Sequence, residues 1–191
     1  GNKTMSKLWT QDVFNKAWDY ASLAHHGQTY STPVEGVRMD YINHVGAVAM
    51  ELMWGLAADN QGLDFDHALQ CALLHDVLED TPRTYPELAA EFGQKIAEGV
   101  AALSKNPNLP RTEQMLDSLQ RIQQQPKEVW VVKLADRINN LSAPPAHWTY
   151  ERKLAYRAEA QVIYDHLHPA HALLAARLQQ KIADYSQYLT H

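Results

Sequence analysis

The sequence predicts an all-α fold, a single helical bundle of about eight to ten helices. Apolar residues recur at helical spacing along most of the 191 residues, and sustained strand-type alternation is absent from the sequence. The composition is that of an ordinary globular protein, because 46% of the residues are hydrophobic and 20% are charged. We therefore expect one domain over residues 8–187 and an N-terminal tail over residues 1–7, whose first four residues we exclude from the fold as an expression remnant.

The helix boundaries are marked by capping residues. Thr10 is a favourable N-cap, and Trp9 and Phe14 have the spacing of a hydrophobic staple around it. Thr84 and Glu87 have the spacing of a capping box, which predicts another helix start. The predicted helices cover residues 10–26, 41–57, 66–78, 84–93, 94–103, 111–125, 126–141 and 149–166, and a last helix follows Pro169.

Turn-forming residues separate these helices. The run Asp-Asn-Gln-Gly at 59–62 ends the second helix, and the Asn- and Pro-rich run at 106–110 separates the fifth from the sixth. Pro126 fits the first position of a helix, and Thr149 can cap the one that follows two prolines. Each predicted helix therefore has a chemical reason to begin or to end.

The net charge and the single cysteine of the chain exclude several kinds of function. A formal net charge of −5 argues against non-specific binding of nucleic acid or of an anionic membrane. Without a membrane-length apolar run or a signal-peptide pattern, we expect a cytoplasmic protein. The single cysteine, Cys71, excludes an internal disulfide and a cysteine-rich zinc site. Ten histidines beside it favour a metal site made of imidazoles and carboxylates.

Charged residues follow the most apolar predicted helix, at 66–78. His75, Asp76, Glu79 and Asp80 lie at its carboxyl end. Carboxylates in that position are costly unless they are paired or bind a metal. The alternative is a helix end that surfaces into solvent.

A second apolar helix, at 129–141, carries a polar stripe. Lys133, Asp136, Arg137 and Asn140 recur at the spacing of one helix face. This face is either solvated or lines a cleft opposite the acids of the earlier helix.

His44 completes a candidate metal site. A lone histidine near a helix start is more often structural than functional. Together, however, His44, His75, Asp76 and Asp136 supply two imidazoles and two carboxylates. This donor set suits manganese, iron or a similar divalent ion better than tetrahedral structural zinc.

Four strings carry a family resemblance: AHHGQ at 24–28, YINH at 41–44, ALLHDVLEDT at 72–81 and VKLADRINNL at 132–141. They resemble the hydrolase domain of the RelA/SpoT alarmone enzymes, which belong to the HD superfamily of metal-dependent phosphohydrolases. The similarity extends over about residues 8–185. It implies an HD-domain helical bundle, and we expect a stand-alone small alarmone hydrolase similar in size to the metazoan homologue.

The resemblance also implies a role for each matched residue. It implies one Mn²⁺, or another divalent ion, held by His44, His75, Asp76 and Asp136. Glu79 and Asp80 are implied to position or activate the attacking water. The implied substrate contacts are Asn140, Arg111, Arg152 and Tyr156.

One loop departs from the family pattern. The family follows Gly-Gln with an Arg-Lys pair, whereas this chain has Tyr30 and Ser31 there, in a longer loop. We expect Tyr30 to stack on a purine, and Arg38 and Lys133 to add positive charge. The preference between guanine and adenine stays open.

The leading hypothesis is metal-dependent hydrolysis of the 3′-pyrophosphate of a purine alarmone, (p)ppGpp or (p)ppApp, with release of pyrophosphate, a reaction of the stringent response. One alternative keeps the metal site for another nucleotide, such as a nucleoside monophosphate or NADPH. Another is a non-catalytic nucleotide sensor or antitoxin-like module. The expected partner is a small purine nucleotide rather than nucleic acid or membrane, and a homo-oligomer is left open.

Overall fold

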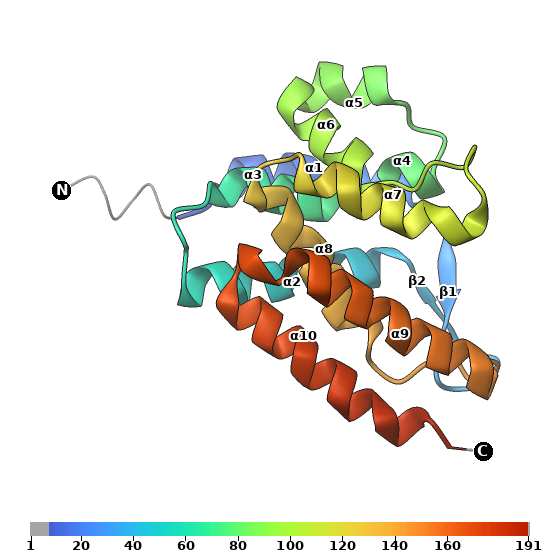
Figure 1. Cartoon of the computed structure of the whole chain (residues 1–191). Coiled ribbons are helices and arrows are strands. Elements are labelled where there is room, and N and C mark those ends of the chain that lie inside the picture. The colour runs from blue at the N-terminus through green and yellow to red at the C-terminus, as the bar shows by residue number, and fades with distance from the viewer. Residues whose placement is uncertain (1–7, 191) are drawn as a thin grey trace.

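Ten α-helices and one short β-hairpin make up residues 8–190, which the computed structural model describes (Figure 1). The all-α prediction is confirmed, while the predicted tail at 1–7 lies outside the described residues. The helices are α1 (Gln11–Ala24), α2 (Ile42–Ala58), α3 (Phe65–Leu74), α4 (Val77–Asp80), α5 (Tyr85–Phe92), α6 (Gln94–Leu103), α7 (Arg111–Gln123), α8 (Lys127–Asn140), α9 (Tyr150–Leu167) and α10 (Ala172–Asp184). The strands are β1 (Thr29–Ser31) and β2 (Arg38–Asp40), and 3₁₀ turns cover His168–Ala170 and Tyr185–Tyr188.

Two of the predicted helix caps form, and a third is replaced. The capping box of Thr84 and Glu87 starts α5, and the hydroxyl of Thr149 caps α9. Thr10 precedes α1 without a side-chain cap. Instead its backbone N–H and its hydroxyl donate to the carboxylate of Asp66, at 2.7 and 2.6 Å. The helix therefore begins at Thr10 as predicted, with Trp9 and Phe14 in contact around it, but the Thr10 side chain bonds a distant residue and does not cap the helix.

Helix α8 runs through the centre of the bundle. It packs against α2, α3, α9 and α10, and nine of its residues are buried. Six of these are apolar, but Lys133, Asp136 and Arg137 are also buried. Charges in such a position need partners from the neighbouring helices. The polar stripe therefore faces the interior of the protein and not bulk solvent.

The predicted helix at 66–78 is interrupted. Helix α3 ends at Leu74, and α4 begins at Val77 after a turn formed by His75 and Asp76. Asp76 has φ −104° and ψ 1°, outside the helical region, and Nδ1 of His75 bonds the carbonyl oxygen of Ala72 at 2.6 Å. The break turns both side chains toward α8, which a continuous helix would not do.

The hairpin is an element that the sequence did not predict. Strands β1 and β2 pair antiparallel, with Tyr30 opposite Met39, and lie on the right of the view in Figure 1. Gly36 takes φ 78° in the connecting loop, a conformation that suits glycine. The carbonyl oxygen of Thr32 accepts a bond from the backbone N–H of Ala146, at 3.1 Å. This bond ties the hairpin to the segment between α8 and α9.

The single cysteine is a packing residue. A Cβ atom added to Gly99 would lie 2.9 Å from Sγ of Cys71 and 3.0 Å from Val129, so α6 packs directly on α3 and α8. Burial raises the pKa of the Cys71 thiol to about 12, which keeps it neutral. The thiol therefore fills space between helices.

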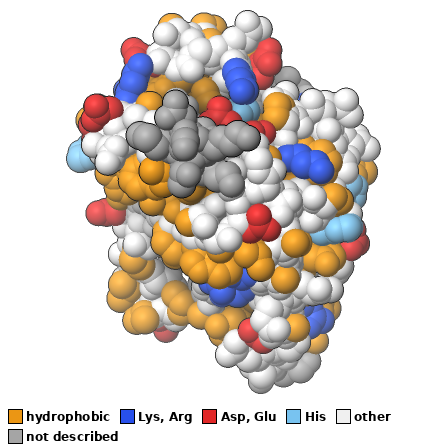
Figure 2. Space-filling view, turned by 90° about the vertical axis from the view of Figure 1, so that its left-hand side faces the viewer, with side chains coloured by type: hydrophobic (Ala, Val, Ile, Leu, Met, Phe, Trp, Pro, Cys, Tyr) orange, Lys and Arg blue, Asp and Glu red, His pale blue; other side chains and the backbone are white. Residues whose placement is uncertain are grey.

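The surface of the described residues gives two further observations. Figure 2 shows lysines and arginines scattered singly over one face, among hydrophobic and acidic side chains. None of the described helices combines the length and the apolarity needed to cross a bilayer.

Candidate active site

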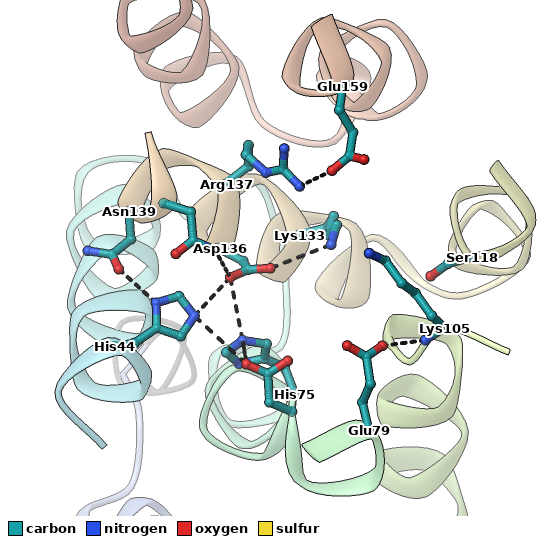
Figure 3. A network of polar contacts seen from close by, with 12 residues as sticks. His44, His75, Glu79, Lys105, Ser118, Lys133, Asp136, Arg137, Asn139 and Glu159 are labelled. Atoms are coloured by element: carbon teal, nitrogen blue, oxygen red, sulfur yellow. Dashed lines mark hydrogen bonds and ion pairs between the residues drawn. The ribbon is translucent and has the colours of Figure 1, made fainter. Parts of the chain in front are cut away.

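Two buried histidines from different elements face one carboxylate (Figure 3). His44 lies in the first turn of α2, and His75 lies in the turn after α3. Their Nε2 atoms are 3.0 and 3.5 Å from Oδ1 of Asp136 on α8. Oδ2 of Asp76 completes the cluster, 2.9 Å from Nε2 of His75 and 3.8 Å from Nε2 of His44. The fold thus brings the four predicted metal ligands together.

The remaining ring nitrogens fix how the histidines point. Nδ1 of His44 donates to Oδ1 of Asn139 at 2.8 Å, and Nδ1 of His75 donates to the carbonyl oxygen of Ala72 at 2.6 Å. With both Nδ1 atoms bonded to acceptor oxygens, both Nε2 atoms face the carboxylates. Metal-bound histidines are oriented in this way by their outer hydrogen bonds.

The cluster fits a divalent cation. The donor atoms of His44, His75 and Asp136 all lie within 4.8 Å of one another. Nε2 of His75 is buried and has no hydrogen-bond partner among the described residues, although Asp76 is near. Burial would lower the pKa of His75, but Asp76 and Asp136 raise it well above its usual value. A positive charge is thus favoured at this point, and the donor set suits a divalent ion.

A second acidic group adjoins the first through Asp76. Donor oxygens of Asp76, Glu79 and Asp80 also lie within 4.8 Å of one another. The hydroxyl of Tyr41 donates to Asp76 and, at 3.3 Å, to Asp80. Burial, followed by the charges of Asp76 and Glu79, raises the pKa of Asp80 to about 6. Asp80 can therefore gain or lose a proton near neutral pH.

Glu79 is held from a different part of the chain. Its Oε1 accepts a hydrogen bond of 2.6 Å from the backbone N–H of Lys105, in the loop after α6. The two residues are joined by the fold, since 26 positions separate them in sequence. This bond orients the Glu79 carboxylate beside the acidic group.

These groups line a cavity of about 570 Å³. The hairpin, including Tyr30 and Met39, forms one wall, and residues of α8 and α9 form another. Charged lining residues comprise five acids and three bases, so the cavity is acidic without a metal. The acids are Asp76, Glu79, Asp80, Asp136 and Glu159, and the bases are Lys105, Lys133 and Arg137. An anionic substrate therefore needs both the metal and the bases.

The predicted substrate residues divide into two groups. Tyr30, Lys133, Asn140 and Tyr156 line the cavity. Asn140 also donates to Oδ1 of Asp136 at 3.2 Å, so it supports a proposed ligand.

Two predicted substrate contacts do not line the cavity. Arg111 is exposed at the start of α7, and Arg152 is exposed on α9. Arg152 stacks over the ring of Trp148, 4.3 Å from its centroid, and that ring does line the cavity. Arg38, expected to restore charge, bonds Thr29 and Ser31 within the hairpin instead.

Sequence reasoning missed three positions that the structure brings into the site. Tyr41 and Asn139 lie within the recognised strings, next to predicted ligands, but their contacts depend on the fold. Lys105 lies just before the helix-breaking run at 106–110, and no sequence pattern connects it to Glu79.

The comparisons with known proteins agree with this geometry. Residues 17–174 match the model of the HD domain family. The chain belongs to the HD domain family. This HD protein is 30% identical over 166 residues to guanosine-3′,5′-bis(diphosphate) 3′-pyrophosphohydrolase MESH1 of Danio rerio, covering 85% of this chain and 88% of the relative. Identity to the Drosophila melanogaster protein of that name is 28% over 171 residues, covering 87% of this chain and 91% of the relative.

A solved structure supports the same relationship. It belongs to a metazoan SpoT ortholog that is described as hydrolysing ppGpp and acting in starvation responses. The TM-score is 0.78 at 26% sequence identity, over 96% of this HD protein and 99% of the other chain. The predicted resemblance to RelA/SpoT-type hydrolase domains is thereby confirmed.

Proposed function

We propose that this HD protein hydrolyses the 3′-diphosphate of a purine alarmone, ppGpp or its adenine counterpart, and releases pyrophosphate. The observation that carries the proposal is the convergence of His44, His75, Asp76 and Asp136 beside a nucleotide-sized cavity, which all of them except His75 line. The named activity of the relatives supports the choice of substrate.

The four converging residues would hold a divalent ion. When bound, such an ion polarises a phosphoryl oxygen and lowers the pKa of a coordinated water. Mn²⁺ is our expectation for the ion, and the cytoplasm our expectation for the place of action. Asn139 and Asn140 support this role, because they hold His44 and Asp136 in place.

Glu79 and Asp80 handle the proton of the attacking water. The water oxygen forms a bond to the 3′ phosphorus, and the bond from that phosphorus to the 3′ oxygen breaks. One carboxylate takes the proton that the water loses, and the 3′ oxygen gains a proton to become a hydroxyl. The pKa of Asp80, raised to about 6 by burial and by neighbouring acids, suits proton transfer near neutrality.

The hairpin wall would receive the base. Tyr30 is half-buried there, and its hydroxyl accepts a bond of 2.6 Å from Asn43. Its ring meets Tyr41 edge to face, with centroids 6.1 Å apart. A ring held from two sides offers a stacking surface for a purine. Asn140 and Tyr156 would contact the rest of the nucleotide.

The test is a substrate assay. The protein is incubated with ppGpp and with ppApp in the presence of Mn²⁺, and released pyrophosphate is measured. We expect release from at least one of them, and an Asp136→Ala variant serves as the inactive control. Absence of release from both nucleotides would refute the proposal.

A second candidate keeps the reaction type but changes the nucleotide. The departure of the Tyr30 hairpin from the family pattern favours it, because this wall is the one proposed to receive the base. NADPH and nucleoside monophosphates are therefore assayed beside the alarmones. Turnover of one of these at a higher kcat/KM than either alarmone would favour the second candidate.

A further inference from the structure

The ammonium group of Lys105 has no salt-bridge or hydrogen-bond partner among the described residues. It is half-buried and lines the cavity. Among residues 8–190 no carboxylate lies within 4.0 Å of its ammonium group, and only its backbone N–H makes a hydrogen bond. The other two cationic side chains that line the cavity are each paired with a carboxylate. Lys133 lies 3.5 Å from Asp136, and Arg137 lies 2.5 Å from Glu159.

The side chains of Lys105 and Lys133 face the same part of the cavity. In Figure 3 the Lys105 side chain extends toward the amino group of Lys133. Although burial opposes it, the charge of Arg137 lowers the pKa of Glu159, and Lys105 and Lys133 lower it further. Two ammonium groups that face one cavity repel each other unless an anion lies between them. The pair is thus a preformed site for a group with more than one negative charge.

This space adjoins the reacting centre. The backbone of Lys105 holds Glu79, and the side chain of Lys133 is next to Oδ2 of Asp136. Oδ1 of the same carboxylate is 3.0 Å from Nε2 of His44. Lys133 therefore contacts a proposed metal ligand, and Lys105 contacts a proposed proton acceptor.

We propose that Lys105 and Lys133 form the subsite for the diphosphate that the reaction removes, with Lys105 as a substrate-binding residue. The inference rests on the proposed function, because it assigns one part of the same cavity. The opposite wall, which contains Tyr30 and Met39, contributes no lysine or arginine to the described lining and suits the base instead. The diphosphate thus lies beside the metal ligands and the base at the hairpin.

Inorganic pyrophosphate is the direct probe. Its binding is measured by calorimetry, with and without Mn²⁺, for the wild type and for Lys105→Met, Lys105→Arg and Lys127→Met. Methionine keeps the length of the side chain but removes the charge, while arginine retains it. Lys127 is the matched control, since it is exposed at the start of α8 and lies over Trp130.

We expect Lys105→Met to weaken pyrophosphate binding roughly tenfold or more, because a charged hydrogen-bond donor to phosphate is lost. Lys105→Arg should restore most of the affinity, and Lys127→Met should leave it unchanged. Mn²⁺ affinity should be the same in all four proteins, since Lys105 contacts no proposed ligand.

Three results would overturn the subsite. The first is wild-type pyrophosphate affinity in Lys105→Met. The second is a wild type that binds no pyrophosphate. The third is a Lys105→Met variant that loses affinity for GDP, which has only a 5′-diphosphate, while it keeps affinity for pyrophosphate. Failure of the proposed function looks different: the wild type binds pyrophosphate in a Lys105-dependent way but releases none from either alarmone.

Discussion

Nδ1 of His44 lies 2.8 Å from Oδ1 of Asn139, and this bond connects the start of α2 to the end of α8. The two residues are 95 positions apart in sequence. Because the amide oxygen of Asn139 bonds Nδ1, Nε2 is the ring nitrogen of His44 that faces Asp136. Asn139, which is not a proposed metal ligand, therefore determines which ring nitrogen of His44 faces the proposed metal site.

The first prediction follows from this bond. Asn139→Leu removes the acceptor, so His44 can rotate or change its tautomer. We expect Mn²⁺ affinity to fall by about 10- to 100-fold, as for other outer-shell partners of metal ligands. Calorimetric titration of the metal measures it. Asn43→Leu is the control, because Asn43 is exposed and bonds Tyr30 instead of a ligand. Equal metal affinity in Asn139→Leu and the wild type would contradict this role.

The second prediction separates a ligand from a proton acceptor. Asp76→Ala should abolish metal binding and activity together, because the Asp76 carboxylate lies within 4.0 Å of both histidines. Glu79→Ala should keep the metal and lower kcat by about 10²- to 10⁴-fold, the range for a general acid or base. Metal content and kcat are measured on the same preparations. Full activity in Glu79→Ala would show that this carboxylate takes no part in catalysis.

The sequence predicted most helix boundaries because they depend on neighbouring residues. The capping box of Thr84 and Glu87 and the cap at Thr149 form as predicted, since a cap bonds backbone groups two or three positions away. The cluster of His44, His75, Asp76 and Asp136 was also predictable as a set, because the strings that contain these residues resemble a known family. Their convergence, however, needed α8 to pack against both α2 and α3.

Other features depend on contacts that no local pattern encodes. The break at His75 lies in a segment that is apolar all round, so helical periodicity continues through it. The hairpin has strands of three residues, too short for alternation to be visible. The hydrogen bond between Lys105 and Glu79 joins the loop after α6 to helix α4. In each case tertiary packing, rather than local propensity, determines the structure.

The third prediction concerns acid stability. Arg137 is buried, stacks on the ring of Tyr156 at 4.1 Å and pairs with Glu159 at 2.5 Å. Although burial opposes it, Arg137 lowers the pKa of Glu159 below its usual value near 4.5. A lowered carboxyl pKa means that the unfolded state binds the proton more readily. The pair therefore stabilises the fold above pH 4.5, and this contribution is lost as the pH falls through the folded pKa.

Glu159→Gln tests this linkage. At pH 7 we expect the variant to be less stable by roughly 1–3 kcal/mol, because a buried guanidinium loses its counter-charge. The difference from the wild type should shrink as the pH falls below 4.5. Urea unfolding between pH 3 and 7 measures it, and Gln161→Glu, on the same helix, controls for a change of one charge. A difference that is constant with pH would contradict the linkage.

The last prediction concerns the base. Tyr30 is held by Asn43 at its hydroxyl and by Tyr41 at its ring, so its position is fixed before a nucleotide arrives. Tyr30→Ala removes the stacking surface, and we expect KM for the preferred alarmone to rise about 5- to 100-fold, since stacking on an aromatic ring contributes roughly 1–3 kcal/mol per base. Tyr30→Phe keeps the ring and should retain a KM near the wild-type value. Steady-state kinetics with ppGpp and ppApp measures both variants, and pyrophosphate affinity, which depends on the other end of the cavity, should be unchanged in each. An unaltered KM in Tyr30→Ala would place the base elsewhere in the cavity.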